Sequence, residues 1–498
     1  MSNNIIIMVK NLKCKLLVLL LMCNSFLLFA QKKDINLSLK QVIDLSLKQS
    51  PMAKLAATSF KNKYWIYKTY KADYKPQLRL NATLPELTRS YQNVAQNDGS
   101  FAFRLRSAST SSVNLNLSQN VGLTGGQFFV GSSLDRLDIF GTSNSVSYLS
   151  SPFLIGFNQP VFGFNNLKWQ NKIEPLRYEE SQKAFNEDME NVAIRASELY
   201  FNLLMAQNMM EIQQKNLANN DTLYKIAVGR YNLGKIAENE LLQMELSVMN
   251  AKTNLAQAQL DVELRQLELK TFLKFKGDEN IILENPNVLP LFEVNENKAL
   301  DEAIKNRQQM VSFKRQILEA ESEVARARGE RLNININASY GLTQSSAIIQ
   351  DVYSKPLEQQ RLRFGIDIPI VDWGRANARI QTAVANKELV ETQMEQAEQN
   401  FKQEVYLSVK QLNMYRQKLL IALTADSITQ KRYDITIKRY LIGKIGIIDL
   451  NMAIIDKNQT KQDYIAALGT YWNAYFELRR KTLYDFELNK PIVYAKDR

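Results

Sequence analysis

The sequence predicts a mainly α-helical fold with a smaller β part, in which one helix–hairpin–long-helix repeat occurs twice. Three observations support this fold class. The 498 residues include only 18 Gly and 11 Pro, two long stretches contain neither, and one motif recurs 209 residues further along the chain. Because turns depend on Gly and Pro, a chain so poor in both has few turns and long elements.

The first 30 residues are typical of a secretory signal peptide, because lysines precede a short apolar core and Ala30 offers a cleavage site. Both cysteines of the chain, Cys14 and Cys23, lie in this segment. Cleavage after Ala30 therefore leaves an exported chain without cysteine. The alternatives are a membrane anchor, which the interruption at Asn24 disfavours, and a lipidated Cys23, which is disfavoured because Met22 replaces the small residue of a lipobox.

The composition narrows the possible functions. The chain has no histidine, which excludes His-based catalytic triads, His metal sites and the usual general base near neutral pH. We therefore expect no enzyme, no cofactor and no metal site. The formal net charge of +12 is spread along the chain without a nucleic-acid-binding module, so we expect no nucleic-acid partner. After the signal, no run of 18 apolar residues predicts an ordinary transmembrane helix.

Two long stretches, residues 176–228 and 375–442, contain no Gly or Pro. Their apolar residues recur at spacings of three and four, for example at Ala196, Leu199 and Leu203. This spacing predicts helices that pack side by side as in a coiled coil. The predicted helices are a long helix at about 166–231, a return helix at about 237–276, a second long helix at about 376–440 and its return helix at about 447–485.

The two long-helix segments are copies of each other. The twelve residues Arg230–Leu241 match Arg439–Leu450 at six positions, and the same offset of 209 residues aligns Gly156 with Gly365. A period this long indicates a duplicated domain and not a solenoid. We therefore expect a first repeat over residues 31–285, a second repeat over 286–490 and a C-terminal tail over 491–498.

Each repeat opens with an amphipathic helix, near 37–74 and 298–329, that leads into segments of alternating apolar residues. Alternation predicts strands with two unlike faces, near 76–163 and 332–372. The first hairpin carries 47 more residues than the second, and the pattern around Leu115 suggests that they hold a further hairpin. Each strand is about 10 residues long, the length with which a tilted strand crosses a bilayer.

Two hairpins supply four expected membrane strands per chain. Four strands cannot close into a barrel, and an open sheet edge in lipid leaves backbone groups without hydrogen bonds. Three copies would give a twelve-stranded β-barrel. Each long helix is ~100 Å at 1.5 Å per residue, roughly three times the hydrocarbon thickness of a bilayer. We therefore expect a trimeric barrel in the outer membrane, continued by a long α-helical coiled-coil barrel in the periplasm.

The turns between each long helix and its return helix form the predicted tips of this tube. Gly234 and Gly443 suit such turns because Gly tolerates a positive φ. A glycine that only ends a helix would meet the same requirement. The repeated Arg-Tyr and Lys-Ile flanks favour a docking surface. The candidate docking residues are Arg230, Tyr231, Gly234, Lys235, Arg439, Tyr440, Gly443 and Lys444.

Two acids, Glu240 and Asp449, follow the tips at matching positions. In a trimer they would give rings of carboxylates at the pore constriction, and such rings favour cations. The equally good alternative is an acid that stabilises the first turn of a helix. Arg230 and Arg439 are candidates to pair with acids across the tip and hold it closed, so charge reversal at both is expected to raise conductance.

These motifs, in order and in duplicate, resemble the TolC-type outer-membrane efflux family over nearly all of the mature chain. The segments that carry the resemblance are Leu37–Pro51, Tyr74–Leu78, Asn306–Arg307 and Pro369–Arg375. The resemblance implies a homotrimeric channel-tunnel that is gated at its periplasmic end. It also implies docking to a periplasmic adaptor protein and an inner-membrane transporter, with outer-membrane lipid around the barrel.

The resemblance assigns roles to some tip residues and withholds them from others. The Tyr-x-x-Gly turns resemble the adaptor-binding turns of the family, and Asp449 matches a pore-constricting aspartate. Met452 stands where the best-known members carry a second aspartate, and Ile445 stands where they carry a tip arginine. We therefore expect a different charge network at the gate and weaker block by cations.

The function expected from these features is a passive outer-membrane exit duct for small-molecule efflux. One alternative is the exit duct of a type I protein-secretion system, which would have a similar tunnel. A second alternative, from another class, is a secreted coiled-coil scaffold without a pore.

Overall fold

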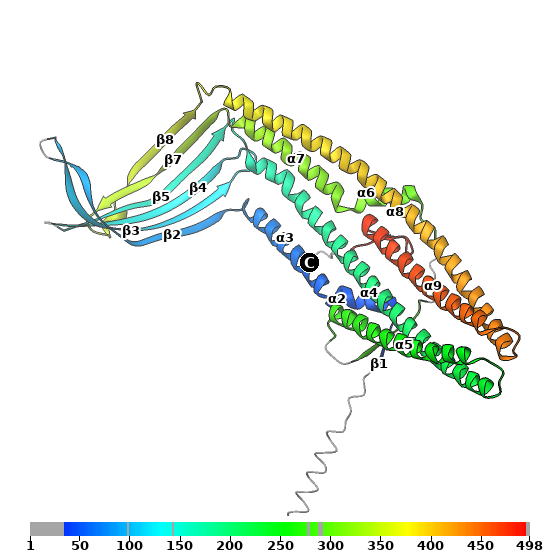
Figure 1. Ribbon diagram of the computed structural model, residues 1–498. Helices are drawn as coiled ribbons and strands as arrows, with labels where there is room; N and C mark the ends of the chain where they lie inside the picture. Colours follow the sequence, from blue (N-terminus) through cyan, green and yellow to red (C-terminus); the bar gives the residue numbers. More distant parts are fainter. Residues whose placement is uncertain (1–33, 97–98, 142–143, 276–278, 287–291, 495–498) are drawn as a thin grey trace, which may run out of the picture. The chain divides into compact units, whose positions relative to one another are not determined.

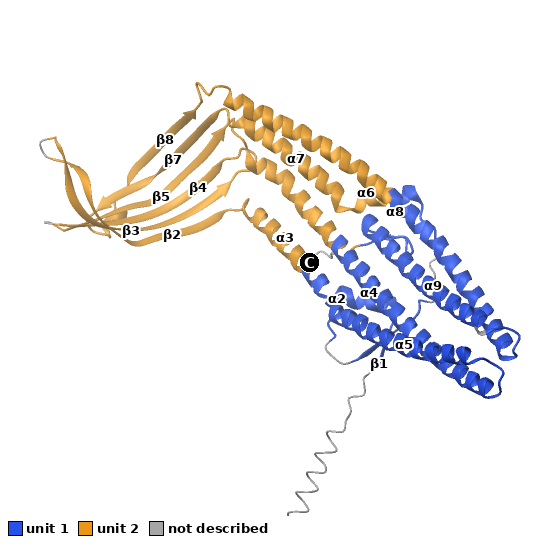
Figure 2. Ribbon diagram, viewed as in Figure 1, with its two compact units in different colours: residues 1–56, 187–299, 406–492 blue, residues 57–186, 300–405, 493–498 orange. Residues whose placement is uncertain are grey.

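The computed structural model describes residues 34–96, 99–141, 144–275, 279–286 and 292–494. The predicted signal peptide therefore lies outside the described residues. The chain divides into two compact units, which are coloured separately in Figure 2. Unit 1 comprises residues 1–56, 187–299 and 406–492, and unit 2 comprises 57–186, 300–405 and 493–498.

The two units do not coincide with the two predicted sequence repeats. Each unit contains segments of both repeats, because strands from both share one sheet in unit 2 and the later parts of both long helices lie in unit 1. The duplication is therefore visible in the order of the elements along the chain and not as two separate bodies.

Unit 2 contains a six-stranded antiparallel sheet (Figure 1). Its strand order is β2-β3-β4-β5-β7-β8, so each strand pairs with the strands that precede and follow it within this series. The first repeat supplies four of the strands and the second supplies two. The strands are β2 (Gln77–Ala95), β3 (Phe101–Asn120), β4 (Gln127–Phe140), β5 (Ser145–Val161), β7 (Asn333–Ser346) and β8 (Leu357–Asp367).

The sheet has six strands, whereas the sequence predicted four membrane strands per chain and left the place of the further hairpin open. The extra residues of the first repeat do hold a further hairpin, and its strands are fully paired within the same sheet. Leu115 on β3, for example, is in register with Leu80 on β2 and with Ser132 on β4. The twelve-stranded barrel expected from three copies counted four strands per chain, so it does not account for all six strands of the sheet. In the described single chain the sheet is open, with β2 and β8 at its edges.

Four helices form the long elements of the chain. α4 (Asn166–Asn232) and α8 (Arg375–Leu441) have 67 residues each and run through both units, whereas α5 (Glu238–Leu273) and α9 (Ile447–Thr482) have 36 residues each and lie in unit 1. Within unit 1 the apolar spacing of α4 faces inward, because Ala196, Leu199, Leu203 and Ala206 are all buried.

Shorter helices occupy the segments where one amphipathic helix was expected in each repeat. The first expected helix is divided at Ser50, where Pro51 begins the next helix because its fixed φ and missing N–H suit a first helical position. The second is divided at Arg307. The resulting helices are α2 (Leu39–Gln49), α3 (Pro51–Ala72), α6 (Glu296–Asn306) and α7 (Gln308–Gly329).

Aromatic and ionic contacts join the helices of unit 2. Tyr67 of α3 stacks on Tyr178 of α4 with ring centroids 4.5 Å apart and planes inclined by 3°. Arg315 of α7 forms an ion pair with Glu180 of α4 at 2.5 Å. The segments before and after the first-repeat strands are thereby packed together.

Small elements complete the fold. Among the described residues, no helix is both long and apolar enough to cross a membrane. A parallel pair, β1 (Asp34–Leu37) and β6 (Asn280–Leu283), lies in unit 1. The remaining elements are the antiparallel pair β9 (Tyr484–Asp485) and β10 (Lys490–Pro491), and the 3-10 helix η1 (Asp351–Tyr353) between β7 and β8.

Candidate functional site

The two tip turns have the same backbone geometry. Gly234 and Gly443 have φ angles of +65° and +73°, a conformation that side chains disfavour. In the first turn the Gly234 N–H donates to the Tyr231 carbonyl at 2.8 Å, and the Lys235 N–H donates to the Arg230 carbonyl at 2.9 Å. The matching distances in the second turn are 2.9 and 3.0 Å. Both turns are Schellman motifs, which end the long helices and reverse the chain into the return helices.

Both tips contribute to one apolar cluster in unit 1, although their sequences are 209 residues apart. A hydrogen bond crosses between the repeats, because the Asn219 side-chain amide donates to the Tyr433 hydroxyl at 3.2 Å. Burial raises the pKa of Tyr433 above its usual value, so this hydroxyl stays protonated. The buried members of the cluster are Leu223 and Ala227 of α4, Met244 of α5, Tyr433 and Tyr440 of α8, and Leu450 of α9.

Arg230 and Tyr440 make a second contact between the repeats. The guanidinium carbon of Arg230 lies 5.5 Å from the centroid of the Tyr440 ring, a cation–π arrangement. Tyr440 is only 7% exposed, whereas Tyr231, its counterpart in the first repeat, is 39% exposed. Arg439, the counterpart of Arg230, is exposed as well. One Arg-Tyr contact, between Arg230 and Tyr440, therefore joins the two repeats, whereas Tyr231 and Arg439 remain at the surface.

The arginines of the two tips were expected to pair with acids. In the described single chain Arg230 lies over an aromatic ring instead. Ion pairs that the described residues form near the tips join other side chains, for example Arg432 to Asp456 at 2.6 Å, Lys225 to Asp221 at 2.6 Å and Lys461 to Asp426 at 3.4 Å. Closure by Arg–acid pairs across the tips therefore stays a prediction about an assembly of chains.

The predicted constriction residues lie at the starts of the return helices. Glu240 is exposed in the first turn of α5, and Asp449 is exposed in the first turn of α9. This position is favourable for a carboxylate in any helix. One chain contributes one acid of each kind, so the rings of carboxylates also stay a prediction.

A groove of about 700 Å³ lies between the ends of α8 and α9 in unit 1. The sequence prediction included Arg439 and Asp449 from its lining but missed Ile428 and Ile435, which are each 60% exposed. Their spacing of seven residues was the available signal. The lining residues are Ile428, Lys431, Arg432, Ile435, Thr436, Arg439, Ile445, Asp449 and Met452.

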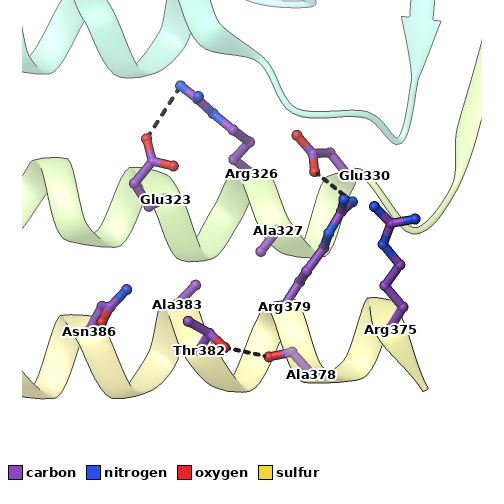
Figure 3. Close-up of a pocket in the computed structure, with 10 residues that line it drawn as sticks. All are labelled: Glu323, Arg326, Ala327, Glu330, Arg375, Ala378, Arg379, Thr382, Ala383 and Asn386. Carbon is purple, nitrogen blue, oxygen red and sulfur yellow. Dashed lines mark hydrogen bonds and ion pairs between the residues drawn. The ribbon is translucent and has the colours of Figure 1, made fainter. Parts of the chain in front are cut away.

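A second groove, of about 630 Å³, lies in unit 2 between α7 and the start of α8 (Figure 3). Figure 3 shows Ala327 and Ala383 pointing between the two helices, where their small side chains leave space. Charged side chains line the rim, and Arg379 forms an ion pair with Glu330 at 3.9 Å. This groove is a polar depression whose charges are partly compensated.

The sheet of unit 2 has an apolar face that extends over all six strands. Side chains two positions apart lie on the same face, and the register links the strands in a row. Leu78 of β2 pairs with Leu117 of β3, which pairs with Val130 of β4, and Ile155 of β5 continues the row. On β8 the same face carries Phe364, which is 64% exposed.

The opposite face of the sheet is mainly polar, although on β4 it also carries Phe129, Leu137 and Ile139. Arg79 of β2 is in register with Asn116 of β3, and Asn158 of β5 is in register with Asn337 of β7, which pairs with Arg363 of β8. On β4 this face carries Ser133. From Gln127 to Leu134 the inserted β4 therefore follows the two-faced pattern in part, whereas further along β4 the pattern reverses, with Arg136 on the apolar face and Leu137 on the other.

Comparison with known proteins identifies the family. The profile of the family described as Outer membrane efflux protein matches residues 127–273 and 299–482. No curated protein matches the sequence.

Solved structures share the fold. CmeC, an outer membrane channel of Campylobacter jejuni, has a TM-score of 0.63 and 15% identity over 89% of this chain and 85% of its own. MtrE, an outer membrane channel of Neisseria gonorrhoeae, has a TM-score of 0.59 and 16% identity over 89% and 88%. CusC has a TM-score of 0.62 and 15% identity over 89% and 91%. The family match covers more than half of the chain and parts of both sequence repeats, and the chain therefore belongs to the outer membrane efflux protein family.

Proposed function

We propose that this chain is one subunit of a homotrimeric outer-membrane channel-tunnel, the passive exit duct of a tripartite efflux system. The observation that carries the proposal is the six-stranded sheet, which has one mainly apolar and one mainly polar face. Large apolar side chains on its edge strands, such as Leu80 at 67% and Ile366 at 66%, are exposed in the single chain. This pattern suits lipid on one side and a water-filled lumen on the other.

The two edges of the sheet support closure by further copies. β2 and β8 run in opposite directions, so β8 of one copy can pair in antiparallel fashion with β2 of the next in a head-to-tail ring. Three copies then give eighteen strands. With strands ~4.8 Å apart and tilted by ~40°, the backbone diameter is ~36 Å, against ~24 Å for twelve strands.

The helices of unit 1 supply a second argument for neighbouring subunits. One stripe of α8, which includes Leu412 and Leu419, is buried within the chain. A second stripe lies two positions further on, which is ~200° around the helix. Its residues are 41% to 69% exposed, and a heptad stripe of this kind packs against another helix. They are Leu407, Met414, Ile421, Ile428 and Ile435.

The tips are the proposed contact with the rest of the efflux system. In this proposal they dock a periplasmic adaptor protein, which connects the duct to an inner-membrane transporter, and Glu240 and Asp449 constrict the pore. The repeats over 31–285 and 286–490 each contribute one tip per subunit. The duct needs no chemistry of its own, because the transporter supplies the energy.

Sizing and conductance of the purified mature chain test this proposal. We expect a trimer by mass in detergent and cation-selective conductance steps in planar bilayers. A monomer that is soluble without detergent and shows no conductance would contradict the proposal and favour a scaffold. Copurification with an adaptor and a peptide-exporting pump would leave the duct intact but assign it to type I secretion.

A further inference from the structure

The surface of the first repeat that receives the second repeat can be traced residue by residue. Leu223 and Ala227 of α4 pack in one buried cluster with Tyr433 and Tyr440 of α8. Ile236, which begins the approach to α5, packs against the same cluster. With the Asn219 hydrogen bond to Tyr433 and the Arg230 contact with Tyr440, the two tyrosines of repeat two are held by repeat one.

The offset of 209 residues maps this receiving surface onto the groove beside α8. Asn219, Leu223, Ala227, Arg230 and Ile236 correspond to positions in the second repeat that all line the groove of about 700 Å³. Those positions are Ile428, Arg432, Thr436, Arg439 and Ile445. The first copy of this surface is filled within the chain, whereas the second copy is open.

The same offset identifies what would fill the open copy. Tyr433 and Tyr440 correspond to Tyr224 and Tyr231 of the first repeat. Tyr224 is partly buried in its own chain, and Tyr231 remains 39% exposed. The first repeat of the chain is already packed against its own second repeat, so a first repeat that fills the groove has to come from another copy.

We infer that the groove beside α8 receives Tyr231 of the next copy, with Arg439 over its ring, as Arg230 lies over Tyr440 within the chain. The inference rests on the proposed trimer, in which first and second repeats alternate around the ring. The tips then close through six Arg–Tyr contacts, three within chains and three between chains.

Charge supports this occupant. The groove presents three basic residues, Lys431, Arg432 and Arg439, and one acid, Asp449. The surface that carries Tyr231 continues into the first turn of α5, where Glu238 and Glu240 lie. The excess positive charge of the groove suits an aromatic guest that is followed by two acids.

The contact between copies is more polar than the contact within a chain. Where the first repeat places Leu223 and Ala227, the groove places Arg432 and Thr436, and Arg432 is held in an ion pair with Asp456 at 2.6 Å. Removing a polar surface from water gains less free energy than removing an apolar one. The seams between copies are therefore expected to part before the seams within each chain when the tip opens.

Thiol crosslinking tests the assignment, because the sequence contains no cysteine after Cys23. The test variant carries Tyr231→Cys and Arg439→Cys, and the matched control carries Arg230→Cys and Tyr440→Cys. The mature full-length protein is treated in detergent with a short bis-maleimide and run on a denaturing gel. We expect covalent dimers and trimers from the test variant, and only an internally linked monomer from the control.

The outcomes separate this inference from the proposed function. If the test variant is still a trimer by mass but runs as unlinked monomers while the control is linked, the groove holds something else and the inference fails. If the protein is a monomer by mass, the proposed trimer itself fails. An Arg439→Lys variant should keep a low frequency of channel opening and Arg439→Ala should raise it at least several-fold; equal opening frequencies in the two variants would also contradict the Arg439–Tyr231 contact.

Discussion

Replacing Arg479 by methionine should strongly destabilise unit 1. The Arg479 guanidinium forms an ion pair with Glu190 at 3.0 Å and another with Asp485 at 3.3 Å, and it lies over the rings of Tyr475 and Phe476. The Glu190 side chain is completely buried, and that of Arg479 is 17% exposed. Removing one partner of a buried ion pair costs about 3–5 kcal/mol, because the other charge is left in the interior.

Loss of the Arg479 guanidinium should cost more free energy at Glu190 than at Asp485. Asp485 also accepts hydrogen bonds from the Tyr475 hydroxyl at 2.9 Å and from the backbone N–H groups of Glu487 and Leu488. Glu190, whose side chain is completely buried, therefore accounts for most of the cost. The double variant Arg479→Met with Glu190→Gln should recover most of the lost stability, since it removes both charges of that pair.

The assay is the thermal loss of helical circular dichroism of the detergent-purified protein. For the single variant we expect a drop in the midpoint on the order of 10 °C. The control is Arg480→Met on the same helix turn, where the pair with Glu477 is partly exposed and contributes ~0–1 kcal/mol. Equal midpoints for the Arg479 and Arg480 variants would refute the reasoning.

Three further predictions address the tips and the core. Gly234→Ala should destabilise the tip by about 1 kcal/mol because of its positive φ, whereas Gly229→Ala in the interior of α4 should stabilise by a similar amount; chemical denaturation compares them. Burial raises the pKa of Tyr471 to about 12, so the unfolded state loses this proton first, and stability falls as the pH rises from 10 to 12. A Tyr471→Phe variant should show a shallower alkaline loss of helix in a pH titration, and an unchanged slope would count against the burial argument. If the first-turn acids constrict the pore, Glu240→Gln with Asp449→Asn should lower the cation preference measured by reversal potentials, whereas an unchanged reversal potential would leave them as helix-stabilising acids.

Local patterns in the sequence were sufficient to predict much of the helical part of the fold. The positive φ at Gly443 was expected because this glycine ends a long heptad run. The buried positions of α4, such as Leu203, were expected from the spacing of its apolar residues. The break at Pro51 was missed, because one helix was expected over 37–74, although the missing N–H of proline disfavours a helix interior.

The sequence alone did not predict which distant strands and helices contact one another. The alternation around Leu115 predicted a further hairpin, but alternation cannot say which strands become neighbours, so the sequence did not specify that this hairpin joins the same sheet. The contact between Arg230 and Tyr440 depends on how α4 and α8 align in unit 1, which the 209-residue repeat does not specify. The exposed stripe through Ile428 and Ile435 was present in the heptad register but was obscured by the buried stripe two residues away.

An end-on view of the membrane part of the purified assembly, by electron cryo-microscopy, tests most directly whether copies of the chain complete one another. We predict a closed ring of eighteen strands, six from each of three chains, with β8 of each chain beside β2 of the next. A barrel closed within one chain, or a single subunit whose sheet stays open in the micelle, would contradict the account.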